Sequence, residues 1–262
     1  MKREDRLQLV RKIDRSIRPA GMPHVNARPK KQPRQARGGV QPNIRRMVPD
    51  PIEAETINPI LAGKTAVLFA TGPSLTQEVV DTVLAAREHK ELYLFGCNDA
   101  YQIMPFLDVL YACDASWWNI HYKELVDYPT KYGMWTQEPH LSKGRFPKLH
   151  RIAGRNGQGL STDQNQIHFG NNSGYQLINL ALLFGIKHFI LCGYNMAVVG
   201  GKRHFFGDHP QGLNRSGSYT GFVRNYDSIK PELYQIDIIN ATPNSALRAF
   251  PQMSLDDALQ KF

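Results

Sequence analysis

The chain has 262 residues, 42% of them apolar, and carries 32 Lys and Arg against 23 Asp and Glu. This length and composition suffice for one large domain with an appendage. No segment approaches the roughly 18 consecutive apolar residues of a membrane-spanning helix, and the charged N-terminus lacks the apolar core of a secretory signal. We therefore expect a cytoplasmic protein without a membrane span.

The positive charge is concentrated at the N-terminus. Residues 1–50 hold 14 Lys and Arg against 4 Asp and Glu, whereas the remaining residues hold 18 against 19. Apolar residues at helical spacing predict a short amphipathic helix over 3–17, and the Pro-, Gly- and Arg-rich segment after it predicts an extended or disordered linker. Such a segment either contacts nucleic acid or another anionic surface, or stays solvated. We place a basic extension at 1–58 and a folded domain at 59–262.

Beyond residue 60, short apolar runs alternate with helical patterns. Several of the strand candidates are almost entirely apolar, as in a sheet that helices cover on both faces. The predicted strands are 65–70, 92–96, 109–113, 133–137, 149–153, 188–194 and 234–239, and the predicted helices are 75–88, 115–124, 173–185, 217–229 and 254–261. This alternation predicts an α/β fold with a doubly wound, mostly parallel, Rossmann-like sheet.

The turn after the first predicted strand is a candidate ligand site. Ser74 and Gln77 form a Ser-x-x-Gln pattern, which predicts a capped helix start whose free N–H groups attract an anion. Gly72 can adopt a positive φ and lets a ligand approach the backbone. The alternative is an ordinary tight turn between a strand and a helix.

Polar residues recur at the ends of later strands. Ser173 and Gln176 repeat the Ser-x-x-Gln pattern, so two helix starts at one sheet edge can hold one phosphorylated ligand. Asn98, Asp99 and Asp114 follow two other strands and are candidates to bind a ribose, a base or a metal. Asp114 is equally suited to capping the helix that follows it.

A long Gly-rich loop after the strand at 188–194 carries His204, Asp208 and His209. Long loops in compact domains are often functional. The spacing lacks a third strong ligand for zinc, so a histidine that accepts a proton is the favoured functional interpretation. The alternative is a pair of inert, solvent-facing side chains.

Five segments of the chain occur in the order found in bacterial lipooligosaccharide sialyltransferases. They also resemble a related group that includes 6-hydroxymethylpterin pyrophosphokinase-like proteins, and this chain is most similar to the short members of that group, which are frequent in bacteriophage genomes. The resemblance covers about residues 64–252 and is more specific for the fold and for nucleotide binding than for the reaction. The segments are LFATGPSL, FGCNDAY, NNSGYQLINLALLFGIKHFILCGYN, HFFGDH and NATPNSALRAFP.

The resemblance implies roles for individual residues. In the family, the catalytic base is a histidine after an aromatic-x-Gly pattern; the segment FFGDH has one extra residue, so His209 is the nearer match and His204 its competitor. Tyr194 and Tyr219 are the nearest candidates for the family's tyrosines at the leaving phosphate. The residues that match the family's nucleotide contacts are Gly72, Pro73, Ser74, Leu75, Asn98, Ser173, Gly174, Pro243, Asn244 and Ser245.

Three functions follow from these observations. The leading expectation is a glycosyltransferase that moves a sugar from a nucleotide sugar to an acceptor hydroxyl with a histidine base and no obligatory metal. The second is a Mg²⁺-dependent pyrophosphokinase that uses ATP on a pterin-like alcohol, with Asp99, Asp114 and Asp208 as candidate metal ligands. The third is a non-catalytic nucleotide- or DNA-associated protein that binds through its basic extension. One α/β scaffold supports many chemistries, so the fold alone does not separate them.

Overall fold

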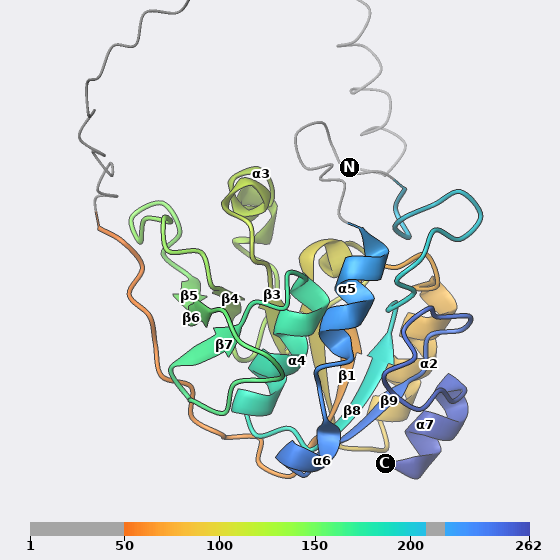
Figure 1. Ribbon diagram of the computed structural model, residues 1–262. Coiled ribbons are helices and arrows are strands. Elements are labelled where there is room, and N and C mark those ends of the chain that lie inside the picture. The colour runs from red at the N-terminus through yellow and green to blue at the C-terminus, as the bar shows by residue number, and fades with distance from the viewer. Residues whose placement is uncertain (1–49, 208–217) are drawn as a thin grey trace, which may run out of the picture. The chain divides into compact units, whose positions relative to one another are not determined.

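Seven parallel strands form one sheet in the computed structural model, which describes residues 50–207 and 218–262 (Figure 1). The helix expected at 3–17 and the candidate base His209 lie outside the described residues. The strand order is β5-β4-β3-β2-β1-β8-β9. The strands are β1 (Thr65–Phe69), β2 (Leu92–Cys97), β3 (Val109–Tyr111), β4 (Met134–Thr136), β5 (Leu149–Arg151), β8 (His188–Cys192) and β9 (Asp237–Asn240).

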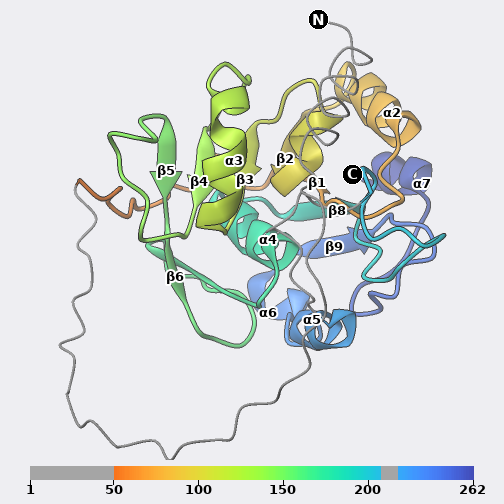
Figure 2. The same cartoon turned by 90° about the horizontal axis from the view of Figure 1, so that it is seen from above.

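Helices cover both faces of this sheet, which confirms the predicted doubly wound α/β fold (Figures 1 and 2). Helices α2 (Gln77–Arg87), α3 (Ala115–Leu125) and α7 (Leu255–Lys261) pack on one face, and α4 (Ser173–Leu183) and α5 (Tyr219–Tyr226) pack on the other. The alternation of side chains along a strand explains both cores. In β1, Val67 and Phe69 join the α2 side, whereas Ala66 and Leu68 join the α4 side.

The segment that enters the domain lies along the outer strand β5. The backbone N–H of Glu55 donates to the carbonyl of Arg151 over 2.7 Å, and Ala54 forms a parallel bridge with the same residue. Ile52 and Ile57 are each only 2% exposed. Residues 52–57, which composition assigned to the linker, therefore contribute to the core of the folded domain.

The main departure from the predicted elements lies before the last strand. The run at 234–239 was expected to be extended, but Pro231–Tyr234 forms the short helix α6 and the strand begins only at Asp237. Pro231 favours a helix start because its fixed φ suits the first turn, and Gln235 ends the helix with a φ of +53°. Three short elements had no sequence signal: η1 (Asn98–Gln102), β6 (Ala153–Arg155) and β7 (Gln166–His168).

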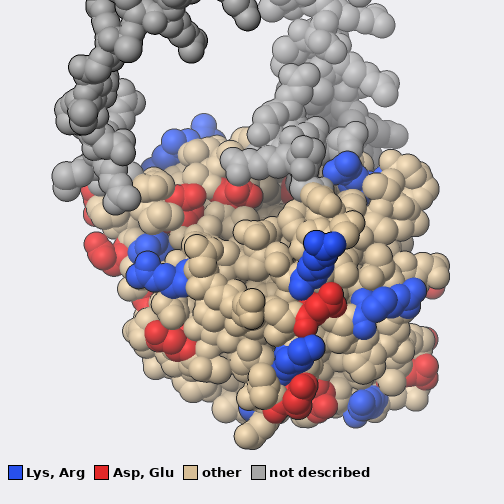
Figure 3. Space-filling model, in the orientation of Figure 1, with Lys and Arg blue, Asp and Glu red and all other residues tan. Residues whose placement is uncertain are grey.

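Charges of both signs are interspersed on the face of the domain that Figure 3 shows. This mixture agrees with the near balance of 18 Lys and Arg against 19 Asp and Glu after residue 50. Among the described helices, none is both long enough and apolar enough to cross a bilayer.

Candidate functional site

The carboxyl ends of β1 and β8 lie side by side, and the chain leaves them toward opposite faces of the sheet. Ligands of doubly wound folds bind at such a point. Here Gly72 donates its N–H to the carbonyl of Gly193 over 2.8 Å. A Cβ on Gly72 would lie 2.3 Å from that carbonyl oxygen and 2.3 Å from Oδ1 of Asn195. Gly72 does not adopt the positive φ that its turn suggested; the glycine is needed because two chain segments meet there.

Ser74 does not cap helix α2, so the predicted capping box is wrong. Thr76 is the N-cap and accepts the N–H of Val79. Ser74 instead donates both its backbone N–H and its hydroxyl to Oδ1 of Asn195, over 3.1 and 2.7 Å. Asn195 is only 2% exposed. A buried amide at the end of β8 therefore holds the turn that follows β1.

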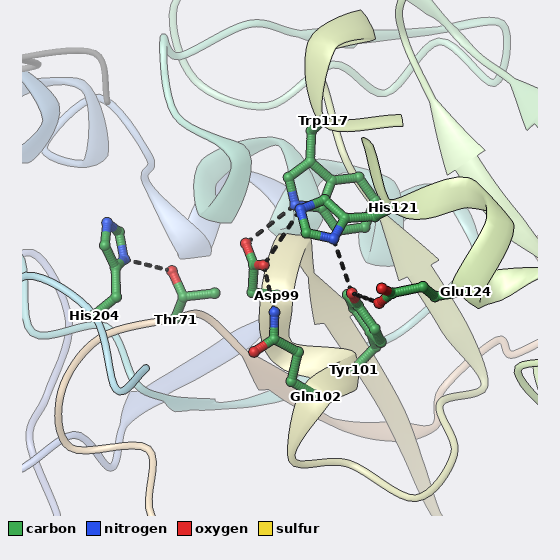
Figure 4. A network of polar contacts seen from close by, with 8 residues as sticks. All are labelled: Thr71, Asp99, Tyr101, Gln102, Trp117, His121, Glu124 and His204. Carbon is green, nitrogen blue, oxygen red and sulfur yellow. Dashed lines mark hydrogen bonds and ion pairs between the residues drawn. The ribbon is translucent and has the colours of Figure 1, made fainter. Parts of the chain in front are cut away.

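His204 lies at the same turn. Its Nδ1 is 3.0 Å from the hydroxyl oxygen of Thr71, the second residue after β1 (Figure 4). The N–H of Phe205 donates to the Thr71 carbonyl, so backbone and side chain hold the segment together. Before His204, the bridge between Val199 and Lys202 closes a tight two-residue turn in which Gly200 and Gly201 both adopt a positive φ. The structure thus brings one of the two candidate histidines to the carboxyl edge of the sheet.

Asn98 follows β2, the neighbour of β1 in the sheet, and begins η1 with a φ of +49°. Such a backbone conformation is uncommon outside glycine, although asparagine tolerates it better than most residues. The side chain is half-buried and makes no hydrogen bond with another described residue. The predicted contact of Asn98 with a ligand stays a prediction.

Asp99, the next residue, is buried and belongs to a network of polar contacts (Figure 4). One carboxylate oxygen accepts the amide of Gln102 over 2.7 Å, and the other accepts the indole N–H of Trp117 over 3.1 Å. Nε2 of His121 lies 3.7 Å from the first oxygen. Both oxygens of this candidate metal ligand therefore serve to fix η1 against α3.

The same network reaches the surface through Tyr101. Its hydroxyl lies 2.9 Å from Nδ1 of His121 and donates to the carboxylate of Glu124 over 3.1 Å. Burial raises the pKa of Tyr101, so this phenol stays protonated near neutral pH. The network thus holds η1, whose first residue is Asn98, against α3.

The start of α4 lies over the end of β3. Asn172, not Ser173, caps this helix by accepting the N–H of Tyr175, so the second predicted capping box is also wrong. The Ser173 hydroxyl lies 3.1 Å from the thiol of Cys113, whose pKa burial raises to about 12. Asp114 occupies the N-cap position of α3 but accepts no hydrogen bond from that helix; the Cys113 thiol donates to it over 3.4 Å.

Gly174 and Tyr194 form a packed contact rather than part of an open pocket. The Tyr194 hydroxyl donates to the Gly174 carbonyl over 3.2 Å, and Tyr194 is fully buried. A Cβ on Gly174 would lie 2.9 Å from both Tyr194 and Tyr226. Tyr219 is half-buried in the first turn of α5 with Arg203 over its ring, so it is the more accessible of the two candidate tyrosines.

Asn244 and Ser245, which follow β9, differ in burial: Asn244 is exposed and Ser245 is buried. Ser245 is fully buried, donates to the Tyr194 carbonyl and accepts the N–H of Leu247, so its hydroxyl holds the loop. Asn244 is exposed with a φ of +52° and lines a cavity of about 780 Å³. Ser74 and Pro243 line the same cavity, whereas the other predicted ligand contacts do not. The cavity lies between the start of α2 and the loop from β9 to α7.

The predicted residues thus fall into two groups. Asn98, Asp114 and Ser173 follow strands or begin a helix at the carboxyl edge of the sheet, where the contact with Thr71 also places His204. Ser74, Pro243 and Asn244 line the cavity beside it. Pro73 is half-buried in the turn between these groups, and Leu75 is buried in the core. Within residues 50–207 and 218–262, no cluster of three or more His, Cys, Asp or Glu is arranged to hold a metal ion.

Sequence reasoning missed Asn195 and Thr71. Both are buried polar residues just after a strand, and each contacts a residue far away in the sequence. Polar residues directly after core strands were the available signal, and Asn195 stood in that position after the strand at 188–194. No protein-family model matches the chain, and a search of the curated proteins finds no match either.

Proposed function

We propose that this protein is a transferase that binds a nucleotide-activated donor, specifically a nucleotide sugar, at the carboxyl edge of its sheet. The observation that carries the proposal is the 3.0 Å contact between Thr71 and His204, at the point where β1 and β8 diverge. This is the place where doubly wound folds bind nucleotides. Asn98 and the start of α4 lie at the ends of the neighbouring strands.

The donor phosphates belong near the start of α4 in this proposal. The helix has 11 residues, and its first N–H groups and dipole favour an anion. Asn98 then contacts the nucleoside or its phosphate from the end of β2. Its unusual φ is held by η1, which the Asp99 network fixes to α3.

His204 is the proposed base. When Nδ1 carries the proton and donates to the Thr71 oxygen, the basic lone pair lies on Nε2. Nε2 takes the proton of the acceptor hydroxyl as its oxygen bonds to the anomeric carbon of the sugar. The bond from that carbon to the phosphate oxygen breaks, and the electron pair leaves with the phosphate. His209 remains an alternative base predicted from the sequence.

The decisive experiment is a donor screen with the full chain. Hydrolysis or transfer from one of a panel of nucleotide sugars, unaffected by EDTA, supports the proposal. Mg²⁺-dependent cleavage of ATP to AMP would instead establish the pyrophosphokinase. If neither donor class is turned over, the transferase proposal fails. His89→Ala is a suitable control for variants of the proposed histidine base, because His89 is exposed and follows the end of α2.

A further inference from the structure

The cavity beside the proposed donor site is lined by acidic and neutral side chains. Its volume of about 780 Å³ is within the range of pockets that hold small molecules. None of the described residues that line it is Lys, Arg or His, whereas Glu78 and Asp256 contribute two carboxylates. The starts of α2 and α7 also lie at the cavity, but Glu78 and Asp256 stand in the first turns of these helices and offset their positive ends. A phosphate group or another anion would therefore meet net negative charge without a compensating cation.

Several polar groups of the cavity have hydrogen-bonding capacity to spare. The amide of Asn244 and the carboxylates of Glu78 and Asp256 make no hydrogen bond or ion pair with another described residue. The hydroxyl of Thr76 accepts the N–H of Val79 and keeps its own proton to donate. Two strong acceptors, an amide and a hydroxyl donor are suited to a ligand with several hydroxyl groups.

The cavity also has an apolar wall. Val79 and Leu255 are half-buried and line it from α2 and α7, and Met253 lines it from the loop between β9 and α7. Such a wall packs against the carbon-bound hydrogens of a ring while polar groups bind its hydroxyls.

The cavity lies close to the proposed base. Ser74 lines the cavity, and Thr71, three residues earlier, contacts His204. Three residues of chain span at most about 11 Å. A ligand in the cavity is therefore within reach of the residues at the end of β1.

We propose that this cavity binds the acceptor, and that the acceptor is an uncharged molecule with several hydroxyl groups and an apolar face. The proposal rests on the transferase function above and narrows it: an anionic acceptor, such as DNA or an acidic glycan, does not fit this cavity. Glu78 and Asp256 weaken the binding of anions, and Asn244 contributes binding contacts.

The test uses two probes with the same ring and different charge. Methyl α-glucoside is uncharged, and methyl α-glucuronide carries a carboxylate. Saturation-transfer NMR with the full chain should show the glucoside bound and the glucuronide bound about five- to tenfold more weakly. The double variant Glu78→Gln/Asp256→Asn should bring the two probes to similar affinity. Glu88→Gln, at the far end of α2, is the matched control and should keep the discrimination.

Asn244→Gly tests the contact without straining the backbone, because glycine tolerates the φ of +52°. It should weaken glucoside binding at least fivefold. Equal binding of both probes to the wild type, no binding of the glucoside, or unchanged binding in Asn244→Gly would overturn the proposal. The donor screen separates this failure from that of the transferase itself: donor hydrolysis in a protein that fails the sugar test leaves the transferase standing and removes only the acceptor assignment.

Discussion

Oδ1 of Asn195 accepts both the hydroxyl and the backbone N–H of Ser74, across a sequence separation of 121 residues. The contact joins the segment after β8 to the turn after β1, and this turn carries both Ser74, which lines the cavity, and Thr71, which contacts His204. Its energy can be measured because each partner can be truncated separately.

Ser74→Ala should destabilise the fold by about 1 kcal/mol, and Asn195→Ala by about 2 kcal/mol, since the latter leaves the Ser74 N–H without its acceptor. In the Asn195→Ala background, Ser74→Ala should cost almost nothing. Urea unfolding of the two single variants and the double variant measures this coupling. Additive effects would show that the hydrogen bond contributes nothing to stability.

Gly72→Ala should destabilise the domain by about 2–3 kcal/mol, because the new methyl group would overlap the carbonyl of Gly193, which joins the segments after β1 and β8. Gly221→Ala is the matched control. A Cβ there meets no atom within 4 Å, and the position is exposed in α5. The control should gain about 0.5–1 kcal/mol from helix propensity. Thermal unfolding compares them, and a Gly72→Ala variant as stable as the wild type contradicts the packing argument.

Asn98 allows backbone strain to be separated from ligand contact. Asn98→Gly should keep the stability of the wild type, whereas Asn98→Ala should lose about 1 kcal/mol at a φ of +49°. Both should weaken donor binding about tenfold if the amide contacts the nucleotide, a loss typical of one hydrogen bond. Calorimetric titration with the nucleotide sugar that the wild type turns over measures the affinity. Wild-type affinity in the glycine variant would remove Asn98 from the donor site.

His204→Ala should lower turnover about 10²- to 10⁴-fold while the dissociation constant of the donor stays within a few-fold, as expected for a general base. Thr71→Val keeps the shape of Thr71 but removes the hydrogen bond to Nδ1, and it should lower kcat by a smaller factor with little change in KM. His209→Ala is the necessary comparison. A large loss in that variant alone would assign the base to His209, and full activity in both would exclude histidine-base catalysis.

Deletion of residues 1–45 should leave the stability and the donor affinity of the remaining domain unchanged. The cut lies before Asp50, whose carbonyl accepts the N–H of Lys143. Any binding to nucleic acid should weaken sharply and lose most of its salt dependence, because most of the Lys and Arg before residue 50 are removed. Filter binding at several salt concentrations tests this, and an unchanged salt slope would place the contact on the domain.

The fold could be predicted because its signals are local and repeated. Most of the seven strands are short runs of apolar residues. Val67 and Leu68 show why: neighbouring residues of β1 point into the two cores on opposite faces of the sheet, so both must be apolar. The contacts of the candidate site were harder to predict from the sequence. Ser-x-x-Gln predicted caps at Ser74 and Ser173, but Thr76 and Asn172 take those roles.

The reason is that a cap competes with tertiary partners. A local sequence pattern cannot reveal that Asn195 accepts a hydrogen bond from the Ser74 hydroxyl. Nor can it reveal that the Ser173 hydroxyl lies beside the Cys113 thiol after β3. The same holds for His204, which meets Thr71 across 133 residues. Positions after strands could be predicted from the sequence, whereas the pairs that they form depend on the folded sheet.

Both outer strands of the sheet are paired with segments of the same chain. Ala54 bridges Arg151 beyond β5, and Gln252 bridges Asn240 beyond β9. Unpaired sheet edges are templates on which a second molecule can add its own strand, the first step of edge-to-edge aggregation. With these two segments in place, a neighbouring copy meets an edge that is already paired at Arg151 on one side and at Asn240 on the other. A change that loosens residues 52–57 would expose β5 to intermolecular strand addition.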